Sequence, residues 1–131
     1  MNTLQGYVTP RSFNGYALPV PIQNKLLRTH AKENSMVYLL PQCELFLENN
    51  FMSLFNTINK LNKYDNLGMC SIYMLPDDGI KFNDIINILI KKKITLHFLF
   101  EELVTDPGSI KNFNYDRKIN YLINSNNDLS N

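Results

Sequence analysis

The stretch Gln5–Arg28, QGYVTPRSFNGYALPVPIQNKLLR, contains the features that decide the fold. Its tripeptide GYV is a short apolar run that predicts a β-strand, and Pro10 ends that run. Pro19 and Pro21 then open a helix, because the first helical turn tolerates a residue that lacks an N–H donor. Polar side chains therefore gather where a strand ends and a helix begins, which is where open α/β sheets place their binding sites.

The rest of the chain repeats this alternation of strand and helix. Apolar residues at helical spacing predict helices at about 19–34, 51–61 and 80–92, with a weaker one from Ser109. Apolar runs of strand length lie at about 3–9, 36–40, 67–73 and 94–100. In the first helix we expect Ile22, Leu26 and Leu27 to face the sheet and His30 to be exposed. Strands that are apolar on both faces predict a parallel sheet between two helical layers.

The predicted fold class is therefore α/β, a three-layer α/β/α sandwich with a four-stranded parallel sheet. We expect the flavodoxin-like strand order 2-1-3-4, with residues 1–124 forming a single domain and 125–131 a frayed polar tail. Right-handed crossovers place the carboxyl ends of all these strands at one edge of the sheet. A chain of 131 residues is long enough to bury about two thirds of the surface that its unfolded form exposes.

Charge and composition exclude several classes of protein. The 13 basic and 12 acidic residues give a net charge of +1, so no strong field favours nucleic acid or an anionic membrane. No apolar run reaches the roughly 18 residues of a membrane span, and no signal pattern opens the chain, so we expect a cytoplasmic protein. Free thiols are one interpretation of Cys43 and Cys70, and a disulfide between them is the other.

Residues with chemically useful side chains converge at the carboxyl edge of the predicted sheet. The candidate catalytic residues, for acid–base chemistry, are His97, Glu101 and Ser71. The candidate ligand-binding residues are Thr9, Arg11, Asn14, Gln23, Asn24, Arg28, Glu44 and Tyr73. A structural role is the alternative for several of them, since a histidine or serine in a buried strand also serves packing and internal hydrogen bonding.

Three common types of site are not expected from this sequence. No glycine-rich phosphate-binding loop follows the first strand, and no G-x-S-x-G motif of a serine hydrolase occurs. Two histidines and two cysteines without close spacing do not suit a zinc site. We therefore expect neither a metal nor a cofactor.

Four blocks of the chain resemble the sporadic carbohydrate cluster protein family, small bacterial proteins encoded among genes for surface-sugar biosynthesis. The blocks are GYVTPRSFNGYALPVPIQN, YLLPQCE, CSIYMLP and LHFLFEELV, within about Gln5–Val104. The residues that match the pattern of this family are Gly6, Tyr7, Arg11, Phe13, Gly15, Gln23, Asn24, Arg28, Glu44, Ser71, Pro76, His97 and Glu101. The chain departs from that pattern at 10–13, where Ser-Arg-Pro-Phe is expected, and at Cys70, where a tyrosine is expected.

This resemblance implies a cytoplasmic protein of surface-carbohydrate biosynthesis. Two functions stay open: a small enzyme acting on a sugar or nucleotide-sugar intermediate by acid–base chemistry, or a non-catalytic module that binds a ligand or partner of that pathway. In the enzyme, His97 would exchange the proton beside Glu101, while Arg11 or Arg28 would hold a carboxylate or phosphate. Surplus aromatic residues also predict a symmetric homo-oligomer; they are Phe46, Phe51, Tyr115 and Tyr121.

A more distant resemblance links the chain to the catalytic domain of serine recombinases. It rests on the Gly-Tyr strand, the Gln-Asn pair at the helix start and Glu44, and it implies the same resolvase-like α/β topology. The arginine-rich segment of those enzymes falls at 73–77, where this chain has no arginine. Strand transfer needs cations that stabilise phosphate charge, so recombinase chemistry and nucleic-acid partners are not expected.

Overall fold

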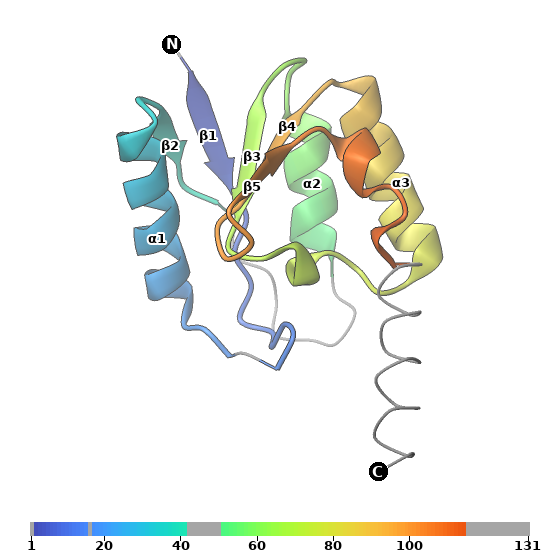
Figure 1. Cartoon of the computed structure of the whole chain (residues 1–131), viewed down its shortest axis with the longest axis horizontal. Helices are drawn as coiled ribbons and strands as arrows, with labels where there is room; N and C mark the ends of the chain where they lie inside the picture. The colour runs from blue at the N-terminus through green and yellow to red at the C-terminus, as the bar shows by residue number, and fades with distance from the viewer. Residues whose placement is uncertain (1, 16, 42–50, 115–131) are drawn as a thin grey trace.

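The computed structural model describes residues 2–15, 17–41 and 51–114, and it confirms the α/β class (Figure 1). The elements are β1 (Thr3–Gly6), α1 (Val20–Glu33), β2 (Val37–Leu39), α2 (Met52–Lys60), β3 (Asn66–Met69), the 3-10 turn η1 (Ile72–Met74), α3 (Gly79–Lys91), β4 (Thr95–Phe98), β5 (Leu103–Thr105) and the 3-10 turn η2 (Pro107–Ile110). Among the described helices, none is both long and apolar enough to cross a membrane.

The sheet has five strands in the order β2-β1-β3-β4-β5. The first four strands are parallel, and β5 runs antiparallel to β4. The prediction of four strands was therefore wrong, and the observed order differs from 2-1-3-4 by the added edge strand. A tight turn after Leu99 reverses the chain, with Glu102 at a positive φ of 51° and its N–H bonded to the Leu99 carbonyl. The three residues of β5 are too few to show a strand pattern in the sequence.

The regular elements are shorter than several of the apolar runs that predict them. The run at 67–73 forms a strand only to Met69, because the Ser71 hydroxyl accepts a hydrogen bond from the Tyr73 N–H and starts η1. The helix expected from Ser109 begins as the 3-10 turn η2, and its continuation past Asn114 lies outside the described residues. After β3, a polar side chain that bonds to the backbone thus ends the strand earlier than hydropathy indicates.

The two faces of the sheet are covered unequally (Figure 1). On one face, α2 and α3 enclose the main core with the inward side chains of β3 and β4. On the other, α1 packs over Gly68, where an added Cβ would lie 3.0 Å from Leu4 and 3.2 Å from Leu27. The prediction that Ile22 and Leu26 face the sheet was wrong, since they are 45% and 37% exposed. In the described chain, no second helix packs beside α1 to cover them.

Gly6 sets how closely the edge strand β2 can approach β1. A Cβ at Gly6 would overlap the Tyr38 hydroxyl and lie 2.8 Å from two ring carbons of Tyr38. The same hydroxyl donates a 2.7 Å hydrogen bond to Asn24, so the tyrosine joins β2 to α1 across the glycine. A side chain at position 6 therefore has to displace this ring.

We predict that Gly6→Ala lowers the free energy of unfolding by roughly 1–3 kcal/mol, the usual cost of overpacking. Gly79→Ala is the matched control, because nothing lies within 4 Å of its added Cβ and alanine suits a helix start at least as well. Urea unfolding followed by circular dichroism measures both variants. Equal stability of the two variants would show that the Tyr38 contact does not restrict position 6.

Candidate functional site

Gln23 holds the loop that follows β1 against α1. Its Nε2 donates to the carbonyls of Thr9 (2.7 Å) and Leu18 (2.8 Å), and its Oε1 accepts from the Thr9 N–H (3.2 Å). Gln23 is fully buried and Thr9 is 1% exposed. The Thr9 hydroxyl accepts in turn from the Arg11 N–H at 3.2 Å. Both residues were predicted to bind ligand, and the structure places their polar atoms in a brace that shapes the loop.

Arg11 projects from this braced loop and is half-buried. Its Nη2 donates to the Tyr7 hydroxyl at 2.8 Å, and its guanidinium carbon lies 4.0 Å from the centroid of the Phe51 ring. Its Nε is buried without a hydrogen-bond partner. In the part of the chain that the structure describes, Arg11 makes no ion pair with a carboxylate. The cation is thus held in place by uncharged groups while its charge stays available to a ligand.

Ser71 and Glu101 meet at the same edge, as expected of residues that follow adjacent parallel strands. The Ser71 hydroxyl donates to Glu101 Oε2 at 3.0 Å, and Glu101 Oε1 accepts from the Ile72 N–H. Because the hydroxyl also accepts from the Tyr73 N–H, Ser71 is engaged on both sides. This pair clamps the ends of β3 and β4, and the serine has no base within the clamp other than a carboxylate.

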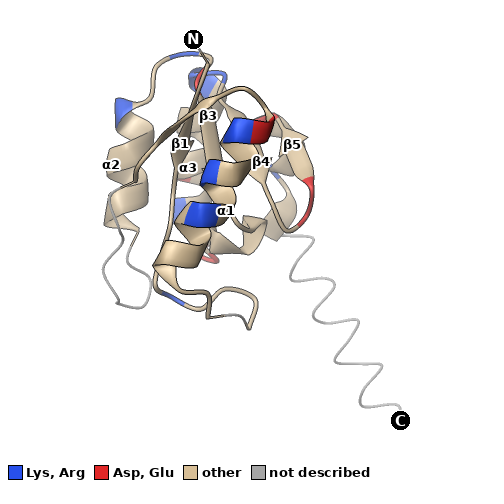
Figure 2. Cartoon of the chain, turned by 90° about the vertical axis from the view of Figure 1, so that its left-hand side faces the viewer, with Lys and Arg blue, Asp and Glu red and all other residues tan. Residues whose placement is uncertain are grey.

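The remaining predicted ligand-binding residues are dispersed around the edge. Asn24 accepts the hydrogen bond from Tyr38, and Arg28 lies 5.8 Å above the ring of Tyr38. Figure 2 shows basic positions along α1 and an acidic one at its end; the charged residues of this helix are Lys25, Arg28, Lys32 and Glu33. Asn14 forms a turn at a positive φ of 48° and is exposed.

Two further positions complete the predicted set. Tyr73 packs its ring edge-on against Phe113, with 5.3 Å between the ring centroids. Glu44 lies outside the described residues, as does Cys43. The aromatic contact of Phe13 with Phe100, 6.2 Å between centroids, brings the Arg11 loop beside the end of β4.

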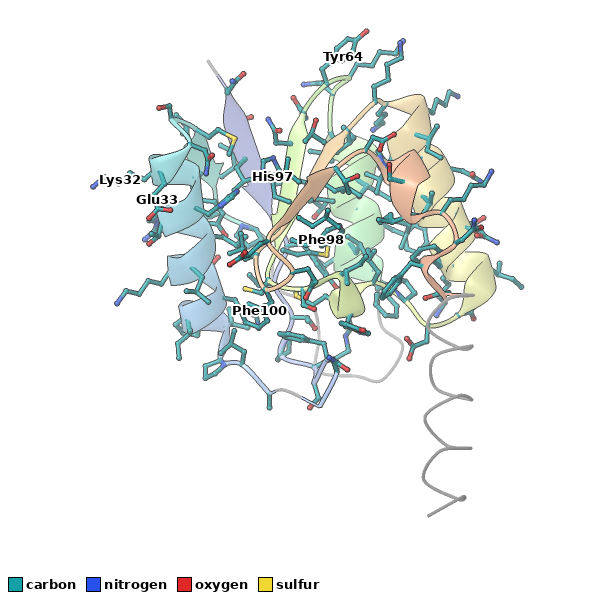
Figure 3. The ribbon with its side chains drawn as sticks, in the orientation of Figure 1. Lys32, Glu33, Tyr64, His97, Phe98 and Phe100 are labelled. Carbon is teal, nitrogen blue, oxygen red and sulfur yellow. The ribbon has the colours of Figure 1, made fainter. Side chains whose placement is uncertain are left out.

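His97 does not lie with Arg11, Ser71 and Glu101. It points from β4 toward α1, and Figure 3 shows it farther from the carboxyl edge than Phe100. Its ring is 7% exposed, with Nδ1 3.0 Å from Nε2 of His30 and Nε2 3.0 Å from Oδ1 of Asn66. The expected pairing of His97 with Glu101 is therefore absent from the described contacts of either residue. His30, expected to be exposed, is half-buried by this contact.

The partners of Asn66 assign the protons along this chain of side chains. Asn66 Nδ2 donates to the Thr3 carbonyl at 3.2 Å, which leaves its Oδ1 to accept from His97 Nε2–H. His97 Nδ1 is then the acceptor for His30 Nε2–H. Burial, followed by the charge of nearby His30, lowers the pKa of His97 to about 4, so this ring stays neutral at neutral pH.

Cys70 is a buried free thiol below the carboxyl edge. Burial, and then the negative charge of Glu101, raise the pKa of Cys70 to about 12, so the reactive thiolate is not formed at neutral pH. Among residues 2–15, 17–41 and 51–114, no group of three histidine, cysteine or acidic side chains is placed to hold a metal ion.

No protein-family model matches the chain, and no curated protein matches it significantly. The geometry itself therefore distinguishes the site residues. The sequence indicated Tyr7 only through the family resemblance and gave Phe51 and His30 no role in the site, although these three residues position the cation and the buried imidazole. The spacing of Tyr7 and Arg11 in one loop was a usable signal, whereas contacts with Phe51 and His30 depend on distant segments.

We predict that Gln23→Met destabilises the fold by roughly 3 kcal/mol, because two buried backbone groups and one partly buried carbonyl lose their partner. Lys25→Met on the same helix is the control; Lys25 is exposed, so its replacement should change stability by less than about 0.5 kcal/mol. Thermal unfolding of both variants checks this. A Gln23→Met protein as stable as wild type would mean that the brace does not hold the loop.

The depressed pKa of His97 predicts a loss of stability in acid. In the unfolded chain this histidine titrates near 6.5, so between pH 6.5 and about 4 the unfolded state binds the additional proton. The contribution of His97 to the free energy of unfolding is complete above pH 6.5. It declines as the pH falls toward 4, by about 3 kcal/mol at most. Urea titrations across this range measure it, and His97→Gln removes the slope that this residue contributes. An unchanged slope in the variant contradicts the assignment.

Proposed function

We propose that this chain is a protein of surface-carbohydrate biosynthesis that binds an anionic sugar or nucleotide-sugar intermediate at the carboxyl edge of its sheet. The observation that carries the proposal is Arg11, a half-buried guanidinium held by Tyr7 and Phe51 without an ion pair to the described chain. Guanidinium groups in this state favour carboxylates and phosphates, which they bind through paired hydrogen bonds. The resemblance to sporadic carbohydrate cluster proteins supports the sugar class, a bacterial origin and a cytoplasmic location.

Several features of the edge support binding as the activity. The brace at Gln23 and the clamp at Ser71 order the loops around Arg11 before any ligand arrives, which reduces the entropy lost on binding. In His97, the predicted acid–base residue, each ring nitrogen is hydrogen-bonded, one to His30 and the other to Asn66. Because neither described histidine lies beside Arg11, the proposal assigns the protein a binding role.

Acid–base catalysis on the same ligand is the second candidate function, and Glu101 supports it. Its carboxylate is exposed at the end of β4, in the clamp with Ser71. The Phe13–Phe100 contact brings the Arg11 loop toward this carboxylate. An anion held by Arg11 would then lie beside a group able to accept a proton.

The homo-oligomer stays a prediction, and the structure removes one of the four aromatic residues on which it was based. Of the four aromatic residues behind it, Phe51 is 6% exposed and belongs to the core. The other three lie outside the described residues. Light scattering measures the oligomeric state, and a monomer would contradict this prediction.

We predict that Arg11→Met weakens binding of the responding nucleotide sugar or acidic sugar by about ten- to a hundredfold, the effect of losing hydrogen bonds to a charged group. Arg28→Met is the matched control, because Arg28 is exposed and packs only over Tyr38 among the described residues. A thermal-shift screen finds the ligand, and calorimetry measures its dissociation constant. A ligand at about 100 times its dissociation constant should stabilise the protein by about 2.7 kcal/mol.

The two candidate functions separate on Glu101→Gln. As a binding protein, this variant keeps its affinity for the ligand within a fewfold range and the ligand is recovered unchanged. As an enzyme, wild type converts the ligand, and the variant loses turnover by about 10²–10⁴-fold while Arg11 still binds. Equal losses of affinity in Arg11→Met and Arg28→Met, or a screen answered by neutral sugars alone, would refute the anion site.

A further inference from the structure

A groove with a volume of about 830 Å³ lies between α1 and the β4–β5 turn, away from Arg11. Figure 2 views this face of the molecule, with α1 in front of the sheet. α1 packs over β1, β2 and β3, and no further described helix covers the same face of β5. Parallel sheets of α/β folds are normally covered on both faces, so this part of the sheet lacks a layer.

Apolar side chains project into the groove from both of its walls. On α1, Ile22 is 45% exposed and Leu26 is 37% exposed. On the opposite wall, Phe100 is 47% exposed and Val104 is 57% exposed. Val104 is in register with His97, so it lies on the face of the sheet that carries α1. Large apolar side chains gathered on neighbouring elements are typical of an interaction surface.

The wall that α1 contributes has the spacing of a helix face that packs against another helix. Its residues recur at steps of three and four positions: Ile22, Lys25, Leu26, Thr29, His30 and Glu33. Thr29 is exposed and small, and it lies midway between the two charged residues of this face. Neither Lys25 nor Glu33 has an ion pair within the described chain. Both charges are therefore available to a neighbouring molecule.

The order of charges on this face is complementary to itself in one arrangement. Lys25 and Glu33 lie four residues before and after Thr29, about 6 Å along the helix axis in each direction. A second α1 that lies antiparallel, with the two Thr29 residues at the crossing, puts each lysine opposite the glutamate of the other copy. A parallel second copy would instead bring like charges together. The antiparallel arrangement has a two-fold axis, which is the usual symmetry of a homodimer.

We propose that the groove is the interface of a symmetric homodimer, in which α1 of a second copy lies antiparallel to α1 and covers the open face beside β5. The inference goes beyond the proposed anion site and does not depend on it. It also uses a different surface from the aromatic residues that predict an oligomer from the sequence.

The two kinds of side chain have different roles in this interface. The four exposed apolar residues of each copy supply the affinity, because their burial is favourable in proportion to the area covered. Exposed ion pairs add little affinity, but they select the orientation of the partner. Glu102 lines the same end of the groove as Lys25. Lys25 therefore lies between that carboxylate and Glu33 of the second copy, and its charge is the one to reverse.

The test measures association of the full chain by sedimentation equilibrium, and we expect wild type to dimerise with a micromolar dissociation constant. Lys25→Glu and Glu33→Lys each place like charges opposite one another at two positions and should weaken the dimer by about tenfold. Mixed in equal amounts, the two variants should form a heterodimer with an affinity near that of wild type, because both positions then carry opposite charges. Lys63→Glu is the control, since Lys63 is exposed and lies outside the groove.

A second pair of variants tests the apolar part of the interface. Leu26→Lys should weaken the dimer by about a hundredfold or more, whereas Leu40→Lys, at a 66% exposed position outside the groove, should not. Thermal unfolding shows that each variant is folded. A wild type that is monomeric at about 100 μM overturns the proposal, and the groove then takes residues 115–131 or another molecule. So does a dimer that Leu26→Lys leaves intact, or a mixture of the two charge variants that associates no better than either alone.

Discussion

The side-chain amide of Gln23 donates two hydrogen bonds to the loop that follows β1 and accepts one from it, and the arrangement of the carboxyl edge depends on these bonds. Without this buried amide, the N–H and carbonyl of Thr9 and the carbonyl of Leu18 would need water in a closed interior. The brace therefore fixes the path of the loop, and the path of the loop puts Arg11 against Phe51. A polar residue at a helix start thus has a structural role, since it fixes the loop that carries Arg11.

The other polar groups of this edge also differ in whether the fold itself satisfies them. Ser71 and Glu101 satisfy each other and the N–H groups of η1, so they hold two strand ends at a constant distance. Arg11 differs from them because its charge is not balanced within the described chain. A charge that the fold supports without neutralising is costly unless a ligand of opposite sign completes it. That contrast, more than the residue types themselves, is the reason that the proposed anion site is placed at Arg11 and not at Ser71 or Glu101.

Unequal covering of the sheet has a second consequence. The face toward α2 and α3 is closed by a continuous core, whereas α1 alone meets the face that β5 extends. Apolar side chains on both sides of the resulting groove stay partly in water, and the half-buried His30, the partner of His97, lies at its wall. The groove is thus a product of topology, since it needs the antiparallel strand β5 and the absence of a further described helix beside α1.

By itself the sequence determined what local patterns control. The apolar stripe at 51–61 predicted α2 nearly to the residue, and strand ends placed Ser71 and Glu101 together because neighbouring parallel strands finish at one edge. Tertiary structure decided the rest. β5 exists because a turn lays three residues against β4, which no periodicity reveals. His97 faces His30 and Asn66, away from Glu101, because strand register and the position of α1 select its neighbours. Such contacts join segments far apart in the chain, so only long-range packing can set them.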